Sequence, residues 1–139
     1  MCRRVAVGAL LLASAMPTAA AAQVNPVGNW ITEGEKAVVT IAPCGPALCG
    51  TLTKILKPEP GAPTTDVHNP DPRLRNRPSA SLRILTGFVA QGTRWQGSIY
   101  NPRSGRTYRS FVEIRPDGTL ALTGCFWMLC QTQTWHRAR

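Results

Sequence analysis

The sequence predicts an all-β fold, a small eight-stranded antiparallel up-and-down barrel or a closely related sandwich, preceded by a helical signal peptide. Beyond the N-terminal segment, no window of ten or more residues has a convincing helical period, and β-rich segments alternate with strand-breaking turns. We expect strands at 27–32, 36–43, 48–56, 81–89, 93–101, 106–115, 119–125 and 129–137. Because the chain is short, a packed interior is favoured over a large cavity.

The first segment has the features of a secretory signal peptide. Arg3 and Arg4 precede an apolar run, 5–16, that is too short to span a bilayer, and alanines follow at a suitable cleavage position. We expect removal of 1–22, which leaves 23–139 as a single β-barrel domain in the periplasm or outside the cell, without a transmembrane segment. A retained membrane anchor is the alternative.

The charge of the chain favours anionic partners. Sixteen basic and seven acidic residues give a formal net charge of +9, of which cleavage removes two positive charges. Envelope polymers, phospholipid headgroups and acidic ligands therefore fit as partners, whereas export makes nucleic acid an unsuitable one. The alternative is that the excess of arginine only keeps a small secreted domain soluble.

The expected strands are separated by recognisable turns. The first three strands carry Val, Ile and Thr, and a cysteine-containing turn separates the second from the third. Gln91-Gly92 suits a tight turn, and Asn101-Pro102-Arg103-Ser104-Gly105 suits a longer hairpin, with proline and glycine at the positions that favour them. Pro116-Asp117-Gly118 then leads into the last two strands.

Four cysteines remain after cleavage, in two pairs of equal spacing, Cys44 with Cys49 and Cys125 with Cys130. In an oxidising compartment an even number of cysteines indicates disulfides, and each pair would sit at the mouth of a turn. Each disulfide would stabilise the fold by roughly 2 kcal/mol. A four-thiolate zinc site and crossed pairing between the two turns are the alternatives.

The long connection between the third and fourth strands is the candidate functional segment. Three prolines between Asp66 and Pro78 exclude a regular helix or a central strand, which leaves a stiff polar loop. Long loops on a sheet scaffold often carry function. Its polar residues fall into an acidic and amide group, Asp66, Asn69 and Asp71, and a basic group, Arg73, Arg75 and Arg77.

The three arginines alternate, so an extended segment would direct them the same way, towards a carboxylate or phosphate. Pairing with Asp66, Asp71 or Glu59 is the alternative, and is favoured for Arg75. Aromatic and polar residues of the neighbouring hairpin could add a stacking and hydrogen-bonding edge. The predicted ligand-binding residues are Asp66, Asn69, Asp71, Arg73, Arg75, Arg77, Tyr100, Asn101 and Tyr108.

The sequence contains no convincing catalytic or metal-binding motif. His68 could act as a base oriented by Asp66, but a solvated histidine is the simpler interpretation. Asp66, Asn69 and Asp71 could offer oxygens to calcium, but two carboxylates make a poor site, and turn capping explains them better. We therefore expect no cofactor, no metal and no catalytic residue, and do not favour an enzyme.

The beginning and end of the barrel resemble those of lipocalins. Gly28-Asn29-Trp30 lies on the first strand and Arg137 near the end of the last. In lipocalins a Gly-x-Trp starts the barrel and a late arginine packs across that tryptophan at the closed base. The resemblance implies a lipocalin- or calycin-like barrel, and a cation over an indole ring would stabilise it.

A wider resemblance links the chain to the small exported bacterial proteins grouped as domain of unknown function 2147. It covers 28–137 and is carried by Gly28-Asn29-Trp30, Cys44 with Leu48-Cys49-Gly50, Asn69-Pro70-Asp71 with Leu74-Arg75 and Arg77-Pro78, Trp95-Gln96-Gly97-Ser98-Ile99-Tyr100-Asn101-Pro102 with Gly105 and Thr107-Tyr108, and Thr132-Gln133-Thr134-Trp135. It implies an envelope location and a compact β-fold, without an established activity. Ser98 and the bulky turn Phe126-Trp127-Met128 depart from the family pattern.

From these resemblances and the burial expected of tryptophan, we assign Gly28, Trp30, Trp95, Trp135 and Arg137 to the fold. Two functions remain open. The first is a binding module for a small anionic or amphipathic ligand, with the arginine loop lining an opening at the barrel rim. The second is an interaction module with a filled core that contacts an envelope protein or anionic polymer through its basic surface.

Overall fold

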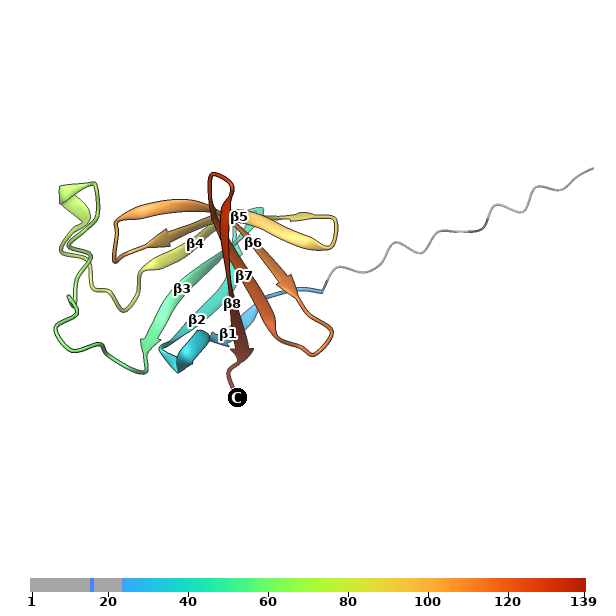
Figure 1. The fold of residues 1–139 in the computed structure, drawn as a ribbon, viewed down its shortest axis with the longest axis horizontal. Coiled ribbons are helices and arrows are strands. Elements are labelled where there is room, and N and C mark those ends of the chain that lie inside the picture. The colour runs from blue at the N-terminus through green and yellow to red at the C-terminus, as the bar shows by residue number, and fades with distance from the viewer. Residues whose placement is uncertain (1–15, 17–23) are drawn as a thin grey trace, which may run out of the picture.

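The computed structural model describes Met16 and residues 24–139, so the predicted signal peptide, Met16 excepted, lies outside the described residues. The described chain is an antiparallel barrel with two short 3-10 helices (Figure 1). Its elements are β1 (Gly28–Ile31), η1 (Glu33–Glu35), β2 (Ala37–Cys44), β3 (Ala47–Ile55), η2 (Pro72–Leu74), β4 (Arg83–Gln91), β5 (Arg94–Asn101), β6 (Arg106–Ile114), β7 (Leu120–Phe126) and β8 (Leu129–Arg137).

Each strand pairs with its neighbours in sequence, and β8 closes the barrel by pairing with β1 through Trp30↔Arg137 and Ile31↔His136. The predicted all-β, eight-stranded up-and-down barrel is therefore confirmed. Strand direction places the β2–β3, β4–β5 and β6–β7 turns at one end, which we call the base. The β1–β2, β3–β4, β5–β6 and β7–β8 connections meet at the other end, the mouth.

The fourth strand starts later than predicted, at Arg83. Ser81 and Leu82 still exchange backbone hydrogen bonds with Leu52 of β3, at 2.7 and 2.8 Å. Ser81 has a φ of 101°, however, which interrupts the extended backbone before the ladder to β5 begins. A single 3-10 turn, η2, also forms in the proline loop, where Asp71 caps the N–H of Arg73 and Pro72 takes the first helical position.

The base is closed by packing around Trp30, which is fully buried. Its indole N–H donates to the carbonyl of Pro26 at 2.8 Å, and the guanidinium carbon of Arg137 lies 4.4 Å from the ring centroid. A β-carbon at Gly28 would come within 2.5 Å of Nη1 of Arg137. Glycine at this position therefore lets the arginine cover the tryptophan.

Two disulfides are present, as predicted, and each lies within its own hairpin. Cys44–Cys49 joins β2 to β3 at the base, with Cα atoms 5.7 Å apart. Cys125–Cys130 joins directly opposed residues of β7 and β8 at the mouth, with Cα atoms 4.1 Å apart. Crossed pairing and a four-thiolate zinc site are thereby excluded.

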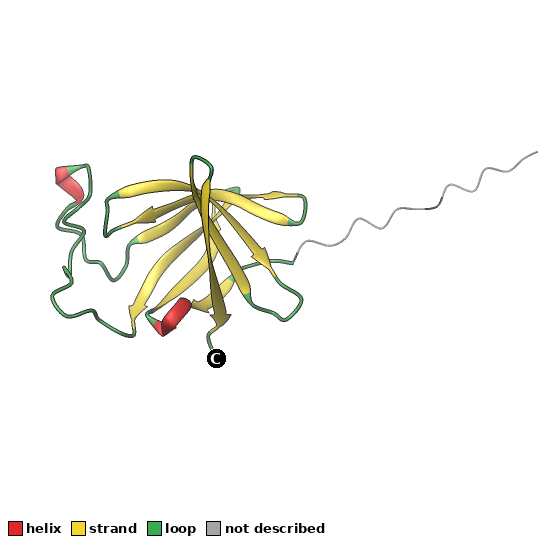
Figure 2. Cartoon of the chain, viewed as in Figure 1, coloured by secondary structure: helices red, strands yellow, loops and turns green. Residues whose placement is uncertain are grey.

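Residues 24–137 contain the whole barrel, the buried core and both disulfides. The core includes Trp30, Val39, Leu85, Leu120 and Trp135. The long β3–β4 connection contains no strand and consists of loop and a single helical turn (Figure 2). No helix in the described part of the chain is long and apolar enough to cross a membrane.

Candidate ligand-binding site

The mouth of the barrel opens into a cavity of about 750 Å³. Its deep wall is apolar and comes from alternate, inward-facing residues of five strands: Leu52, Ile84, Ile99, Leu122 and Trp135. Gly124 leaves further space beside Ile99, since a β-carbon there would lie 3.5 Å from the Ile99 Cγ2 atom. The expectation of a packed interior is therefore wrong for this end of the barrel: bulky core residues such as Trp30 fill the base, while Gly124 and the apolar wall leave the mouth open.

The rim of the cavity is polar. Gln131 and Gln133 of β8 line it, and the indole N–H of Trp135 donates to Oε1 of Gln133 at 3.0 Å. Elsewhere on the rim, Lys36 and Arg103 both bind the Glu59 carboxylate, with Lys36 Nζ at 3.6 Å, and Glu33 also lines the cavity. An apolar wall below a partly cationic rim matches a small molecule with an apolar body and an anionic end.

Asp66 holds the long loop against the barrel. Its side chain is buried, with 1% of the residue surface exposed, and accepts three hydrogen bonds. The Tyr100 hydroxyl donates to Oδ1 at 2.6 Å, while Asn69 Nδ2 and Arg77 Nη2 donate to Oδ2 at 2.8 and 3.0 Å. Because Tyr100 belongs to β5 and also lines the cavity, these bonds couple the loop to the cavity wall.

A close backbone approach makes a second attachment. A β-carbon at Gly105 would overlap the carbonyl oxygen of His68, and Gly105 has a φ of 68°. Glycine is therefore required here for both space and conformation. The loop, green in Figure 1, accordingly lies beside the β5–β6 hairpin.

The Asp66 network shifts two ionisation equilibria. Burial alone would raise the pKa of Asp66, but the hydrogen bonds from Tyr100, Asn69 and Arg77 outweigh it and hold the pKa below its ordinary value. Burial, followed by the hydrogen bond to the Asp66 carboxylate, raises the pKa of Tyr100 to about 12. The folded state therefore favours a charged aspartate beside a neutral tyrosine.

This shift predicts an alkaline limit of stability. A raised folded-state pKa for Tyr100 contributes stability that is complete below about pH 10, the ordinary tyrosine value, and is lost as the pH rises through about 12. We expect the absorbance titration of tyrosinate to show a late step near pH 12 that Tyr100→Phe removes. A titration unchanged by this substitution would contradict the arrangement.

The arginines of the loop bind groups of the loop itself. Arg73 donates through Nη2 to Asp71 at 2.9 Å, and Arg75 donates through Nε to the carbonyl of Asn69 at 2.8 Å. Arg77 pairs with Asp66. The alternative of pairing with Asp71 and Asp66 therefore holds for Arg73 and Arg77, whereas Arg75, for which it was favoured, binds a backbone carbonyl instead of a carboxylate. The three arginines do not share the single direction expected of an extended segment, because η2 turns the backbone there.

Of the nine predicted ligand-binding residues, Tyr100, Asn101 and Tyr108 line the cavity. The other six do not line it, namely Asp66, Asn69, Asp71, Arg73, Arg75 and Arg77. Ligand contact at any of the nine stays a prediction. Sequence reasoning missed the wall residues and the two glutamines, although their alternation in β7 and β8 could have marked them as inward-facing.

The geometry supports neither His68 as a base oriented by Asp66 nor a calcium site at Asp66, Asn69 and Asp71. The His68 side chain is exposed, while the Asp66 carboxylate is occupied by its three donors. Within the described residues, no group of three or more His, Cys, Asp or Glu side chains could hold a metal ion. Asn69 instead accepts a hydrogen bond from the N–H of Asp71, as expected of turn capping.

Comparison with known proteins identifies the family. Residues 28–137 match the family described as uncharacterized proteins conserved in bacteria, domain of unknown function 2147. The chain belongs to this family. None of the curated proteins matches it.

Among solved structures, this member of domain of unknown function 2147 is similar to protein HP1028 from the human pathogen Helicobacter pylori, which is described as belonging to the lipocalin family. The TM-score is 0.71 at 25% identity, and the match covers 84% of this chain and 85% of HP1028. The similarity to HP1028 supports a lipocalin-like barrel, and the packing of Arg137 over Trp30 agrees with it.

Proposed function

We propose that this protein is an exported binding module that takes up a small amphipathic molecule with an anionic end. The observation that carries the proposal is the cavity at the mouth, whose volume lies within the range of small-molecule sites, about 300–1,000 Å³. The apolar wall would receive the body of the ligand. Lys36 and Arg103, which share a single carboxylate, would meet its charged end.

An oxidising location outside the cytoplasm, the periplasm or the medium, forms part of the same proposal. Two disulfides within hairpins and membership of this bacterial family support it. The proposed role of the proline–arginine loop is to fix Tyr100 and the cavity wall through Asp66.

Blocking the cavity tests the proposal. We expect Gly124→Leu to lower affinity for the anionic probe 1-anilinonaphthalene-8-sulfonate at least about tenfold, because the new side chain fills space that the ligand needs. The β-carbon itself fits, and the Gly124 backbone has no positive φ that would strain a side chain. Thr107→Leu, an exposed position on β6, is the matched control and should bind as wild type.

The charged rim is tested with the same probe and an uncharged analogue, N-phenyl-1-naphthylamine. Lys36→Gln with Arg103→Gln should weaken binding of the sulfonate while leaving the neutral probe unchanged. Equal binding by wild type and Gly124→Leu would refute the cavity site. Equal loss of both probes in the rim variant would refute recognition of the anionic end.

A further inference from the structure

The β7–β8 turn presents four consecutive apolar side chains to solvent: Phe126, Trp127, Met128 and Leu129, which we call the apolar tip. Trp127 and Met128 are 86% and 89% exposed, and the other two are more than half exposed. Single exposed apolar residues are common, but a contiguous exposed group of this kind marks an interaction surface.

The backbone of the tip gives an independent indication. Phe126 pairs with Leu129, so Trp127 is the first residue of a two-residue turn, and its φ is 55°. Glycine normally takes such a position, because a side chain is strained there. The fold does not require tryptophan at this point, which indicates that the exposed indole serves a contact outside the molecule.

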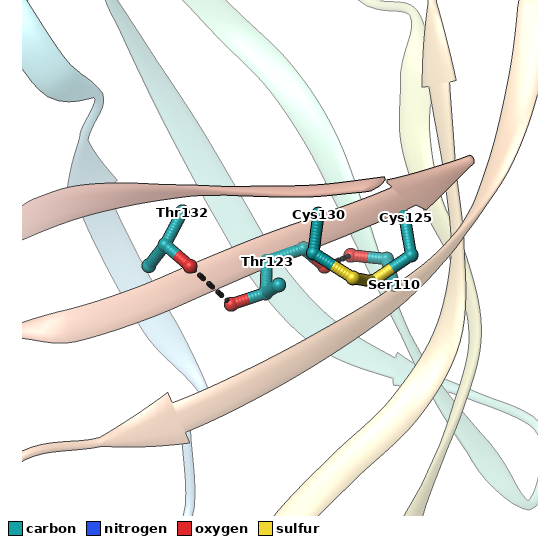
Figure 3. The surroundings of a disulfide bond; sticks show 5 residues. All are labelled: Ser110, Thr123, Cys125, Cys130 and Thr132. Atoms are coloured by element: carbon teal, nitrogen blue, oxygen red, sulfur yellow. Dashed lines mark hydrogen bonds between the residues drawn. A yellow bond between two sulfur atoms is a disulfide. The ribbon is translucent and has the colours of Figure 1, made fainter. Parts of the chain in front are cut away.

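The tip is held in place before any partner binds. Figure 3 shows the Cys125–Cys130 disulfide across β7 and β8, with the hydroxyl groups of Thr123 and Thr132 hydrogen-bonded at 2.8 Å beside it. The ring of Phe126 also packs edge-on against Tyr108 of β6, with centroids 6.1 Å apart. The residues that anchor the apolar tip are therefore already ordered, and they lose little conformational entropy when the tip binds a partner.

The strand beside the tip is basic. Arg106 and Arg109 of β6 are exposed, and Arg109 lies opposite Cys125 in the ladder. No acidic residue occurs in the sequence between Asp71 and Glu113 or after Asp117. Towards β1, Glu33 accepts a hydrogen bond from the N–H of Thr134 in β8, five residues beyond Leu129. On its β6 side the apolar tip therefore adjoins a strand that carries Arg106 and Arg109 and has no acidic residue before Glu113.

We propose that the apolar tip docks the protein onto a bilayer that contains anionic phospholipids, with Trp127 and Met128 entering the interfacial region. Tryptophan favours this region, and nearby arginines attract the headgroups. A protein partner or a second copy of this chain fits less well. A stable protein interface buries about 800 Å² on each side, whereas the apolar tip is a single turn of four residues. Since Phe126 and Leu129 also line the cavity, docking would bring the mouth to the membrane.

Vesicle flotation with the segment 24–139, which contains the complete barrel, core and disulfides, tests the docking. We expect wild type to float with phosphatidylcholine vesicles that contain phosphatidylglycerol. Trp127→Ser with Met128→Ser should reduce the bound fraction at least about tenfold. Val89→Ser removes an exposed apolar side chain near the base and should float as wild type.

The charge and the depth of docking have separate readouts. Arg106→Gln with Arg109→Gln should weaken binding several-fold and remove its dependence on phosphatidylglycerol. Trp127→Phe should still float, and the fluorescence that it removes should be the part quenched by brominated lipid. Trp30 and Trp135 are buried, and the partly exposed Trp95 lies in β5 beside the β4–β5 turn, at the opposite end of the barrel.

Three results would overturn the docking proposal: wild type that does not float, a tip variant that floats equally well, or a wild-type dimer that the tip substitutions dissociate without any vesicle binding. Near-ultraviolet circular dichroism checks that each variant is folded. The tip variant should still bind the anionic probe in solution, because Trp127 and Met128 do not line the cavity. Failure of docking and failure of the cavity site are therefore distinguishable.

Discussion

Replacing Trp30 with alanine is expected to lower the free energy of unfolding by about 4 kcal/mol, the largest effect of any single substitution proposed for this protein. The indole is fully buried at the base, donates to Pro26 and is covered by the guanidinium of Arg137. Its removal would leave a cavity in the core, an unpaired carbonyl and an arginine without its aromatic surface. Denaturant unfolding followed by far-ultraviolet circular dichroism measures the change.

Trp127→Ala is the matched control, because it deletes the same atoms from an exposed turn. Surface substitutions of this kind usually change stability by less than about 0.5 kcal/mol. If both alanine variants lost the same stability, Trp30 would not anchor the base.

Replacing Asp66 with alanine is expected to cost about 3 kcal/mol, because it leaves buried donors without an acceptor. This loss of stability lies at the lower end of the range for breaking a buried charge pair, because the Arg77 side chain is 44% exposed and keeps contact with water. The backbone N–H groups of residues 66 and 69 donate to the carbonyls of Arg77 and residue 66 within the loop, and their hydrogens should exchange faster with solvent in the variant. The loop should also become more sensitive to protease.

Asp71→Ala provides the comparison, because Asp71 also pairs with an arginine but lies near the surface. Its effect should be much smaller than that of Asp66→Ala. The lowered pKa of Asp66 adds a pH signature: its stabilisation is complete above the ordinary aspartate pKa, about 3.9, and is lost as the pH falls through the lower folded value. Acid sensitivity of wild type should therefore exceed that of Asp66→Ala.

Local patterns were sufficient to predict the strands and the disulfides. Alternation in β6 and the turn residues at 91–92, 101–105 and 116–118 are set by backbone conformation within a few residues. The equal spacing of the cysteines, together with turns of suitable length, similarly predicted bridges that form within hairpins.

The site depended on contacts that no local pattern encodes. Asp66 and Tyr100 are 34 residues apart and meet only because the β3–β4 loop folds back onto the β5–β6 hairpin. The direction of the arginines followed the turn at η2 and not the alternation of an extended chain. The open mouth likewise depends on how much volume the inward residues of five strands leave together, a property of the closed barrel and not of any segment.

The pairing of β8 with β1 makes the order of strands circular: every strand neighbours those that precede and follow it, and the last neighbours the first. The two ends of the barrel chain therefore meet in adjacent strands, at Trp30 and Arg137. A short linker joining them, with new termini opened in a turn at the base, would give a permuted chain that preserves the strand neighbours and leaves the mouth untouched.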